Sequence, residues 1–231
     1  GSKLTTIENG ALSDNGKLEA ITIPASVKNI GDYILGWNYS LATVEFEEGT
    51  TLDNIGKGMF FRDEALASIT LPSTVTVIND EAFYNCKALI EIDLSNIDEI
   101  GAYAFYNCAS LKEAILSNDV TELNDAAFYG CSSLEKVKLS EKLTKLGDLI
   151  SEDAEEDVKG VFSGCTSLKE IVIPKGVNTI GKNTFNGCEN LRRVIIETSS
   201  LKKVGANAFN DVSPEAVFVV KNNAAKDELI S

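Results

Sequence analysis

The sequence predicts one right-handed solenoid of about nine coils, in which short β-strands are joined by tight or short 3-10/α turns. The frame Ile-Gly-x-x-Ala-Phe-x-x-Cys-x-x-Leu-x-x-Ile-x-Leu fits the chain nine times, with a period of about 23 residues. No single copy could bury its own apolar face, so the copies are expected to stack around one core. The large apolar anchors of the copies are Leu12, Leu35, Phe60, Phe83, Phe105, Phe128, Phe162, Phe185 and Phe209.

Each copy ends in a short run that alternates apolar and other residues. Leu134, Val137 and Leu139 illustrate the pattern, which is typical of a strand with one buried face. Proline can end such a strand without the loss of a ladder hydrogen bond. It follows the run in three copies, at Pro24, Pro72 and Pro174.

A column of small residues precedes the anchor of each internal copy. Glycine and asparagine both tolerate a positive φ angle, so the column predicts a left-handed turn residue in every coil. The column contains Gly31, Gly56, Asn79, Gly101, Asn124, Gly147, Gly181 and Gly205.

Five cysteines occupy one column of consecutive copies. A row of metal or redox ligands is one interpretation, but a column spreads its members along a line, whereas zinc needs ligands that converge on a point. A second interpretation is a set of disulfides between neighbouring coils. The odd number of cysteines and the parallel directions of their side chains disfavour it. The prediction is a row of buried free thiols, at Cys86, Cys108, Cys131, Cys165 and Cys188.

Composition excludes several classes of function. A net charge of -14 disfavours binding to nucleic acid or to an anionic membrane surface. No apolar run is long enough to insert into a membrane, and the absence of histidine removes histidine-based catalysis and metal binding. With no glycine-rich phosphate loop and no converging acidic pair, the sequence predicts a protein that is not an enzyme and uses no cofactor or metal.

The domain boundaries follow from the repeats. Residues 1–3 form the start of the chain, where Gly1-Ser2 resembles a cloning remnant, so a leader sequence is expected to have been removed. Residues 4–220 form the solenoid, and residues 221–231 a tail or cap. The gap of 34 residues contains an acidic insertion at residues 148–160, which is expected to be a solvated surface loop, because it lacks the spacing of a calcium site.

The motif Phe-x-x-Cys-x-x-Leu-x-x-Ile-x-Leu-Pro with its 23-residue period resembles the BspA-type leucine-rich repeat of bacterial cell-surface proteins. The resemblance covers about Leu4 to Val220, with departures near the two ends. It implies a secreted or surface-anchored bacterial protein, often one that adheres to host proteins, and it implies no catalytic residue. The departures are Leu12 and Leu35 in place of Phe, Asn15, Asn38 and Asp63 in place of Cys, and Val212 in the last copy.

Two outward columns are candidates for binding. The first lies on the strands, on the side that is usually concave in this family, and combines apolar residues with a charged rim. It predicts a protein-binding patch, although β-branched residues also simply suit strands. The patch consists of Ile115, Lys136, Lys138, Val172, Arg193 and Ile195.

The second column follows the anchors and predicts a ladder of aromatic rings along one edge. Such an edge could bind the faces of sugars, or the rings could only stabilise one another. The structural interpretation is favoured. The rings belong to Phe61, Tyr84, Tyr106 and Tyr129.

Three hypotheses follow for function. The first is a non-catalytic, adhesin-like module that presents a rigid surface to a host or neighbouring-cell protein. The second is glycan binding by the aromatic edge, and the third is a structural stalk within a longer surface protein.

Overall fold

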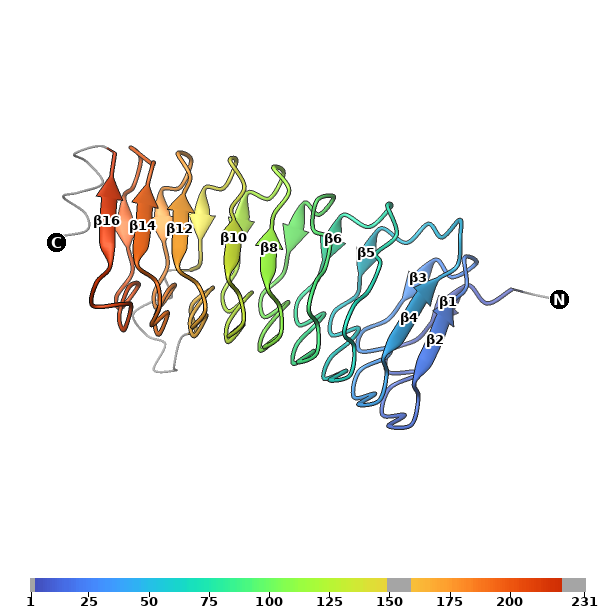
Figure 1. The fold of residues 1–231 in the computed structure, drawn as a ribbon. Coiled ribbons are helices and arrows are strands. Elements are labelled where there is room, and N and C mark those ends of the chain that lie inside the picture. Colours follow the sequence, from blue (N-terminus) through green and yellow to red (C-terminus); the bar gives the residue numbers. More distant parts are fainter. Residues whose placement is uncertain (1–2, 149–158, 222–231) are drawn as a thin grey trace.

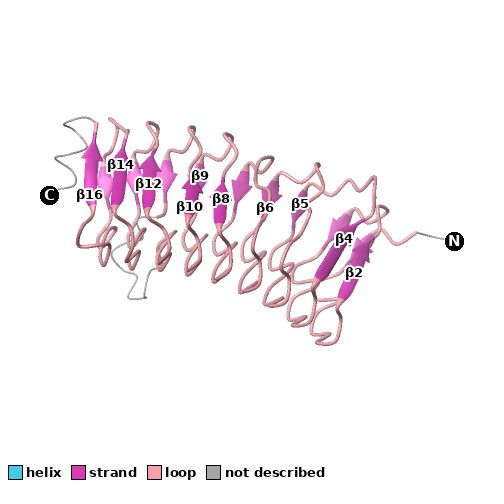
Figure 2. Ribbon diagram, viewed as in Figure 1, coloured by secondary structure: helices cyan, strands magenta, loops and turns pink. Residues whose placement is uncertain are grey.

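The computed structural model describes residues 3–148 and 159–221 and has the predicted solenoid architecture (Figure 1). Nine coils succeed one another along a rod, and the two ends of the chain lie at opposite ends of it. The described residues contain strands and turns and no helix (Figure 2). The predicted tail apart from Lys221, and the acidic insertion apart from Asp148, Lys159 and Gly160, lie outside the described residues.

The predicted strands form a face that we call the front sheet. Its strands are parallel, and equivalent residues of successive coils pair in register, as in Val172 with Ile195. In the third and fourth coils the corresponding segments are joined only by a bridge between Ser68 and Glu91. The strands are β2 (Ala20–Ile23), β4 (Thr43–Phe46), β8 (Glu113–Ile115), β10 (Lys136–Lys138), β12 (Glu170–Ile173), β14 (Arg193–Ile196) and β16 (Val217–Val220).

A second column of two-residue strands, the back sheet, lies on the far side of each coil. Each of these strands ends at the aliphatic residue that precedes the glycine column, and this residue points into the core in most coils. The strands are β1 (Thr6–Ile7), β3 (Asn29–Ile30), β5 (Asn54–Ile55), β6 (Val77–Ile78), β7 (Glu99–Ile100), β9 (Glu122–Leu123), β11 (Lys145–Leu146), β13 (Thr179–Ile180) and β15 (Lys203–Val204).

The prediction of positive φ along the glycine column is wrong. Within that column only Gly147 has a positive φ, whereas the left-handed positions lie two residues after the column and two after the anchor, as at Tyr103 and Asn107. At Gly101 glycine is needed because the preceding coil passes too close for a side chain. A Cβ atom on Gly101 would lie 2.4 Å from the backbone nitrogen of Asp80.

A third ladder runs through the turns that carry the anchors. The N–H of Phe83 donates to Ala104 O in the next coil over 2.8 Å, and the same bond recurs at Phe105. The buried phenylalanine rings stack along the rod with centroids 5.1 to 5.6 Å apart, which is close to the strand spacing of about 4.8 Å. Dispersion between these rings therefore continues through every coil from Phe60 to Phe209.

Among the described residues, both sheets are interrupted together between the second coil, residues 29–46, and the third coil, residues 54–71. Elsewhere only one sheet is interrupted at a time: the front sheet on both sides of the β8–β10 pair, and the back sheet between β7 and β9. In the described part of the chain β4 pairs only with β2, and β3 pairs only with β1. The two coils are joined at the anchor turn, where Leu35 N–H donates to Met59 O and Trp37 N–H to Phe61 O. Figure 1 shows β2 and β4 inclined to the strands that follow, and we call this place the joint.

Candidate protein-binding surface

The C-terminal half of the front sheet carries an outward row that we call the front strip. Main-chain pairing sets Lys138 beside Ile115, Val172 beside Ile195 and Ile195 beside Val219. The alternate residues of β12 and β14 are buried, so the members of the strip point away from the core. The strip consists of Ile115, Lys138, Val172, Ile195 and Val219.

The apolar members of the front strip are partly open to solvent. Val172 and Val219 are each 37% exposed, and Ile115 and Ile195 are half-buried. Three consecutive rungs, β12 to β16, thus present aliphatic side chains in one line on a pre-formed sheet. A row of this kind offers apolar contact area to a partner without a cost of ordering the chain.

The charged rim of the predicted patch is largely neutralised. Lys136 Nζ lies 3.0 Å from Glu113 Oε2, and Arg193 Nε lies 3.4 Å from Glu170 Oε2, each across one rung of the sheet. These pairs are exposed, so each contributes little to stability. Lys138 forms no ion pair with any described residue. The rim is therefore a set of matched charges around the aliphatic row, with Lys138 as the additional cation.

The patch extends further towards the C-terminal end than the sequence predicted. Val217 is 59% exposed and Phe218 is 38% exposed, on the last described strand. Phe218 faces the core side, because it pairs with buried Val194 and meets the Phe209 ring edge-on at 5.1 Å. The sequence signal was the run Val217–Val220, but four consecutive apolar residues show no alternation that separates an inward from an outward face.

The aromatic edge forms the predicted ladder, and its ring faces are occupied. Centroids are 4.6 Å apart between Phe61 and Tyr84, 4.4 Å between Tyr84 and Tyr106, and 4.8 Å between Tyr106 and Tyr129, with nearly parallel planes. At the N-terminal end the ring of Trp37 lies 4.8 Å from Phe61. Sugar binding by stacking needs a free ring face, so this geometry favours the structural role.

Lys159 lies beside the last two rings of the aromatic ladder, those of Tyr106 and Tyr129. Its Nζ donates to Tyr106 Oη over 2.9 Å and lies 5.0 Å and 5.5 Å from the ring centroids of Tyr106 and Tyr129. The hydrogen bond to Tyr106 raises the pKa of Lys159, which keeps the cation that interacts with the rings. Position 163, where the next ring of the column would fall, is Ser163, so the ladder of rings ends at Tyr129 with the lysine beside its last two members.

All five cysteines are buried and none forms a disulfide. Each Sγ lies 3.0 to 3.2 Å from the carbonyl oxygen of the anchor in the preceding coil, as Cys108 does from Phe83 O. Burial raises the pKa of every one of these thiols. A protonated thiol is a poor nucleophile and a poor metal ligand, so the column packs the turn and caps a carbonyl.

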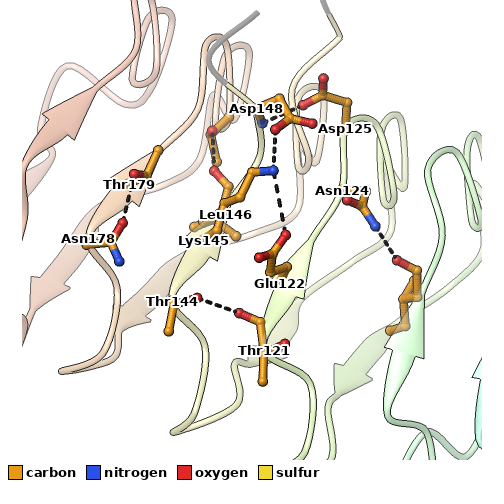
Figure 3. A network of polar contacts seen from close by, with 12 residues as sticks. Thr121, Glu122, Asn124, Asp125, Thr144, Lys145, Leu146, Asp148, Asn178 and Thr179 are labelled. Carbon is orange, nitrogen blue, oxygen red and sulfur yellow. Dashed lines mark hydrogen bonds and ion pairs between the residues drawn. The ribbon is translucent and has the colours of Figure 1, made fainter.

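The polar groups of the back sheet are paired with one another. Lys145 Nζ lies 3.6 Å from Glu122 Oε2 and forms a closer pair with Asp148, whose N–H donates to Asp125 Oδ1 over 2.8 Å (Figure 3). The hydrogen bond to Asp148 raises the pKa of Lys145, and burial raises the pKa of Asp125. Asn124 Nδ2 donates to Ile100 O over 3.0 Å. This network therefore serves to join successive coils.

No group of three or more histidine, cysteine, aspartate or glutamate side chains in the described ranges could hold a metal ion. Within the same ranges no helix could cross a membrane.

The repeat frame, the stacked coils and the buried columns define a leucine-rich-repeat protein. The sequence matches the family model of the BspA type leucine rich repeat region in six copies, over residues 1–62, 53–153 and 158–226. The chain therefore belongs to the BspA-type leucine-rich-repeat family. Among curated proteins, none matches it.

Solved structures of bacterial proteins are similar to this chain. A leucine rich cell surface protein from Faecalibacterium prausnitzii is 25% identical with a TM-score of 0.59, over 97% of this chain and 65% of that protein. A leucine-rich repeat protein from Bacteroides ovatus is 26% identical with a TM-score of 0.51, over 95% and 70%. The leucine rich repeat protein of T. pallidum is 30% identical with a TM-score of 0.62, over 71% and 72%.

Proposed function

We propose that this chain is a non-catalytic, adhesin-like module of a bacterial surface protein that binds a host or neighbouring-cell protein through the front strip. The observation that carries the proposal is the line of half-exposed aliphatic residues on β12, β14 and β16, framed by neutralised charge pairs. Protein-binding patches combine an apolar centre with a polar rim in this way. The cell-surface description of the F. prausnitzii protein supports the location.

Rigidity supports the same proposal. The strip lies on paired strands: β14 is bonded on both edges, to β12 and to β16, and β8 is bonded to β10. The backbone of the surface is fixed before any partner arrives, so little conformational entropy is lost on binding. The family resemblance also predicts that this side of the front sheet is concave.

The test uses two surface variants and immobilised extracellular-matrix and mucin fractions. Val172→Ser with Ile195→Ser should weaken binding by at least roughly tenfold, since a few central residues carry most of the energy of an interface. The control is Val77→Ser, a partly exposed β-branched residue in the same outward position of the back sheet. All proteins are compared by surface plasmon resonance and thermal unfolding.

The outcomes separate function from folding. The double variant is expected to keep its melting temperature to within a few degrees, because exposed substitutions change stability by about 0.5 kcal/mol or less. Equal binding by the double variant and the wild type would remove the front strip from the interface. A large fall in melting temperature would show that these side chains belong to the core.

A further inference from the structure

The joint leaves one edge of β4 without a partner. Thr43 N–H donates to Glu19 O and Glu47 N–H donates to Ile23 O, so these residues direct their polar groups towards β2. Neighbouring residues of a strand face opposite sides, and Val44 and Phe46 therefore direct their N–H and C=O groups towards the third coil. In the described chain no backbone hydrogen bond joins them to residues 68–71.

This edge differs from the equivalent edge near the other end of the rod. There β14 is bonded through all four of its residues to β12 on one side and to β16 on the other. Four residues of β4 extend over about 13 Å, at a rise of about 3.3 Å per residue. Such an open, pre-formed edge is the template to which an extended peptide can add as another strand.

The open edge borders a groove of about 590 Å³. One wall is β4 with the turn that follows it, and the other wall is the end of the third coil with the turn that follows it, residues 68–74. The volume lies within the range of about 300 to 1,000 Å³ that is usual for ligand sites. The spacing between Leu35 and Phe60 is 25 residues instead of about 23, and the two additional residues lie between the turn at Glu48 and Gly49 and the strand β5.

The lining of the groove is acidic. It includes Glu45, Glu47 and Glu48, and no lysine or arginine of the described ranges lines it. Glu47 accepts a hydrogen bond from Ala25 N–H over 2.8 Å. Among the described residues Glu45 accepts a hydrogen bond only from Thr22 Oγ1, over 3.5 Å. Hydroxyl groups of Thr43, Thr70 and other residues supply the remaining polar surface. The electrostatic complement of this groove is a cation.

We propose that the groove binds an extended, lysine- or arginine-bearing polypeptide segment, whose backbone pairs with the free edge of β4. The backbone of the segment accepts hydrogen bonds from the N–H groups of Val44 and Phe46 and donates hydrogen bonds to their C=O groups. Its basic side chains, at alternate positions, reach Glu45 and Glu48. The strand edge supplies affinity that does not depend on sequence, and the carboxylates select a basic partner. This site lies at the N-terminal end of the front sheet and is separate from the front strip.

The test measures fluorescence anisotropy with labelled hexapeptides at about 150 mM and higher concentrations of NaCl, because screening by salt weakens attraction by net charge alone. The parent peptide is Lys-Val-Lys-Val-Lys-Val, and the acidic comparison is Glu-Val-Glu-Val-Glu-Val. In two further peptides the backbone nitrogen is methylated, at every lysine in one peptide and at every valine in the other. Because only alternate N–H groups of an added strand face β4, one methylated peptide should bind like the parent, and the other roughly tenfold more weakly.

A pair of matched protein variants tests the carboxylates. Glu45→Lys with Glu48→Lys should weaken binding of the parent peptide by at least roughly fivefold, since two attractive charges become repulsive. Glu135→Lys with Glu189→Lys is the control, because both residues are exposed, lie outside the groove and change the net charge equally. Circular dichroism and melting temperature establish that all variants are folded.

Each outcome decides the proposal. Absence of binding by the parent peptide overturns it, as does equal binding by both methylated peptides, which would indicate attraction by net charge alone. Equal loss of binding in the groove variant and in the control variant has the same consequence. The Val172→Ser/Ile195→Ser variant should bind the peptide like the wild type, so failure of the proposed function and failure of this site are distinguishable.

Discussion

Replacing Asp63 with asparagine should stabilise the protein at neutral pH. Asp63 occupies the cysteine column of the third coil, is fully buried, and accepts a hydrogen bond from Asn38 N–H at Oδ1 over 2.9 Å. Its Oδ2 has no hydrogen-bond partner among the described residues. The equivalent side chain one coil earlier, Asn38, accepts from Asn15 N–H at Oδ1 and donates through Nδ2 to Leu12 O and Leu35 O.

Burial raises the pKa of Asp63 from 3.8 to about 8. The folded state therefore keeps a proton that the unfolded state releases above about pH 4. The stability linked to this proton is fully present below the unfolded pKa and is lost as pH rises through the folded pKa. The loss amounts to about 1.4 kcal/mol per pH unit between about pH 4 and pH 8.

The Asp63→Asn substitution would remove this dependence, because an amide donates a hydrogen bond at every pH and carries no charge. At pH 7 the expected gain is up to about 4 kcal/mol, from roughly three pH units at about 1.4 kcal/mol each. At pH 4 the aspartate and asparagine proteins should have nearly equal stability. Asp32→Asn, at an exposed position in the preceding coil, is the control and should show no gain.

Urea unfolding between pH 4 and pH 9 gives the measurement, with fluorescence of the single tryptophan, Trp37, as the probe. This indole lies 4.8 Å from the Phe61 ring, next to the joint, so it reports on the region that contains Asp63. A difference in stability that does not change with pH would refute the reasoning. A less stable asparagine variant at pH 7 would refute it as well.

Two further predictions concern the columns of the repeat. Gly101→Ala should destabilise the protein by about 1 to 3 kcal/mol in urea unfolding, since the added Cβ would lie 2.4 Å from Asp80 N, whereas Gly16→Ala, in open space, should change stability by about 0.5 kcal/mol or less. A neutral Gly101→Ala would mean that the coils are not in close contact there. In thiol titration with Ellman's reagent, no cysteine should react rapidly in the native protein and all five should react in urea, because each thiol is buried and unbridged. Fast reaction of the native thiols would contradict their burial, and fewer than five in urea would indicate disulfides.

The family, the solenoid and the positions of its buried columns could all be predicted from the repeat frame. Each column is a local pattern that recurs along the chain at about 23 residues: an anchor such as Phe105 occurs in nine copies, and a thiol such as Cys108 in five consecutive copies. A departure in one copy, such as Asp63 in place of cysteine, therefore does not hide the pattern. A residue whose only neighbours are its equivalents in adjacent coils is specified by the repeat itself.

Tertiary structure decided what happens between particular coils. Glycine at Gly101 serves close approach of a neighbouring backbone and not a positive φ, a distinction that depends on the distance to Asp80. The pairing of Lys136 with Glu113, and the mutual covering of the tyrosine faces, depend on the register of adjacent rungs. A spacing of 25 residues marks the joint in the sequence, but only the relative inclination of two stacked coils determines whether such an insertion bulges outward or opens a groove beside β4.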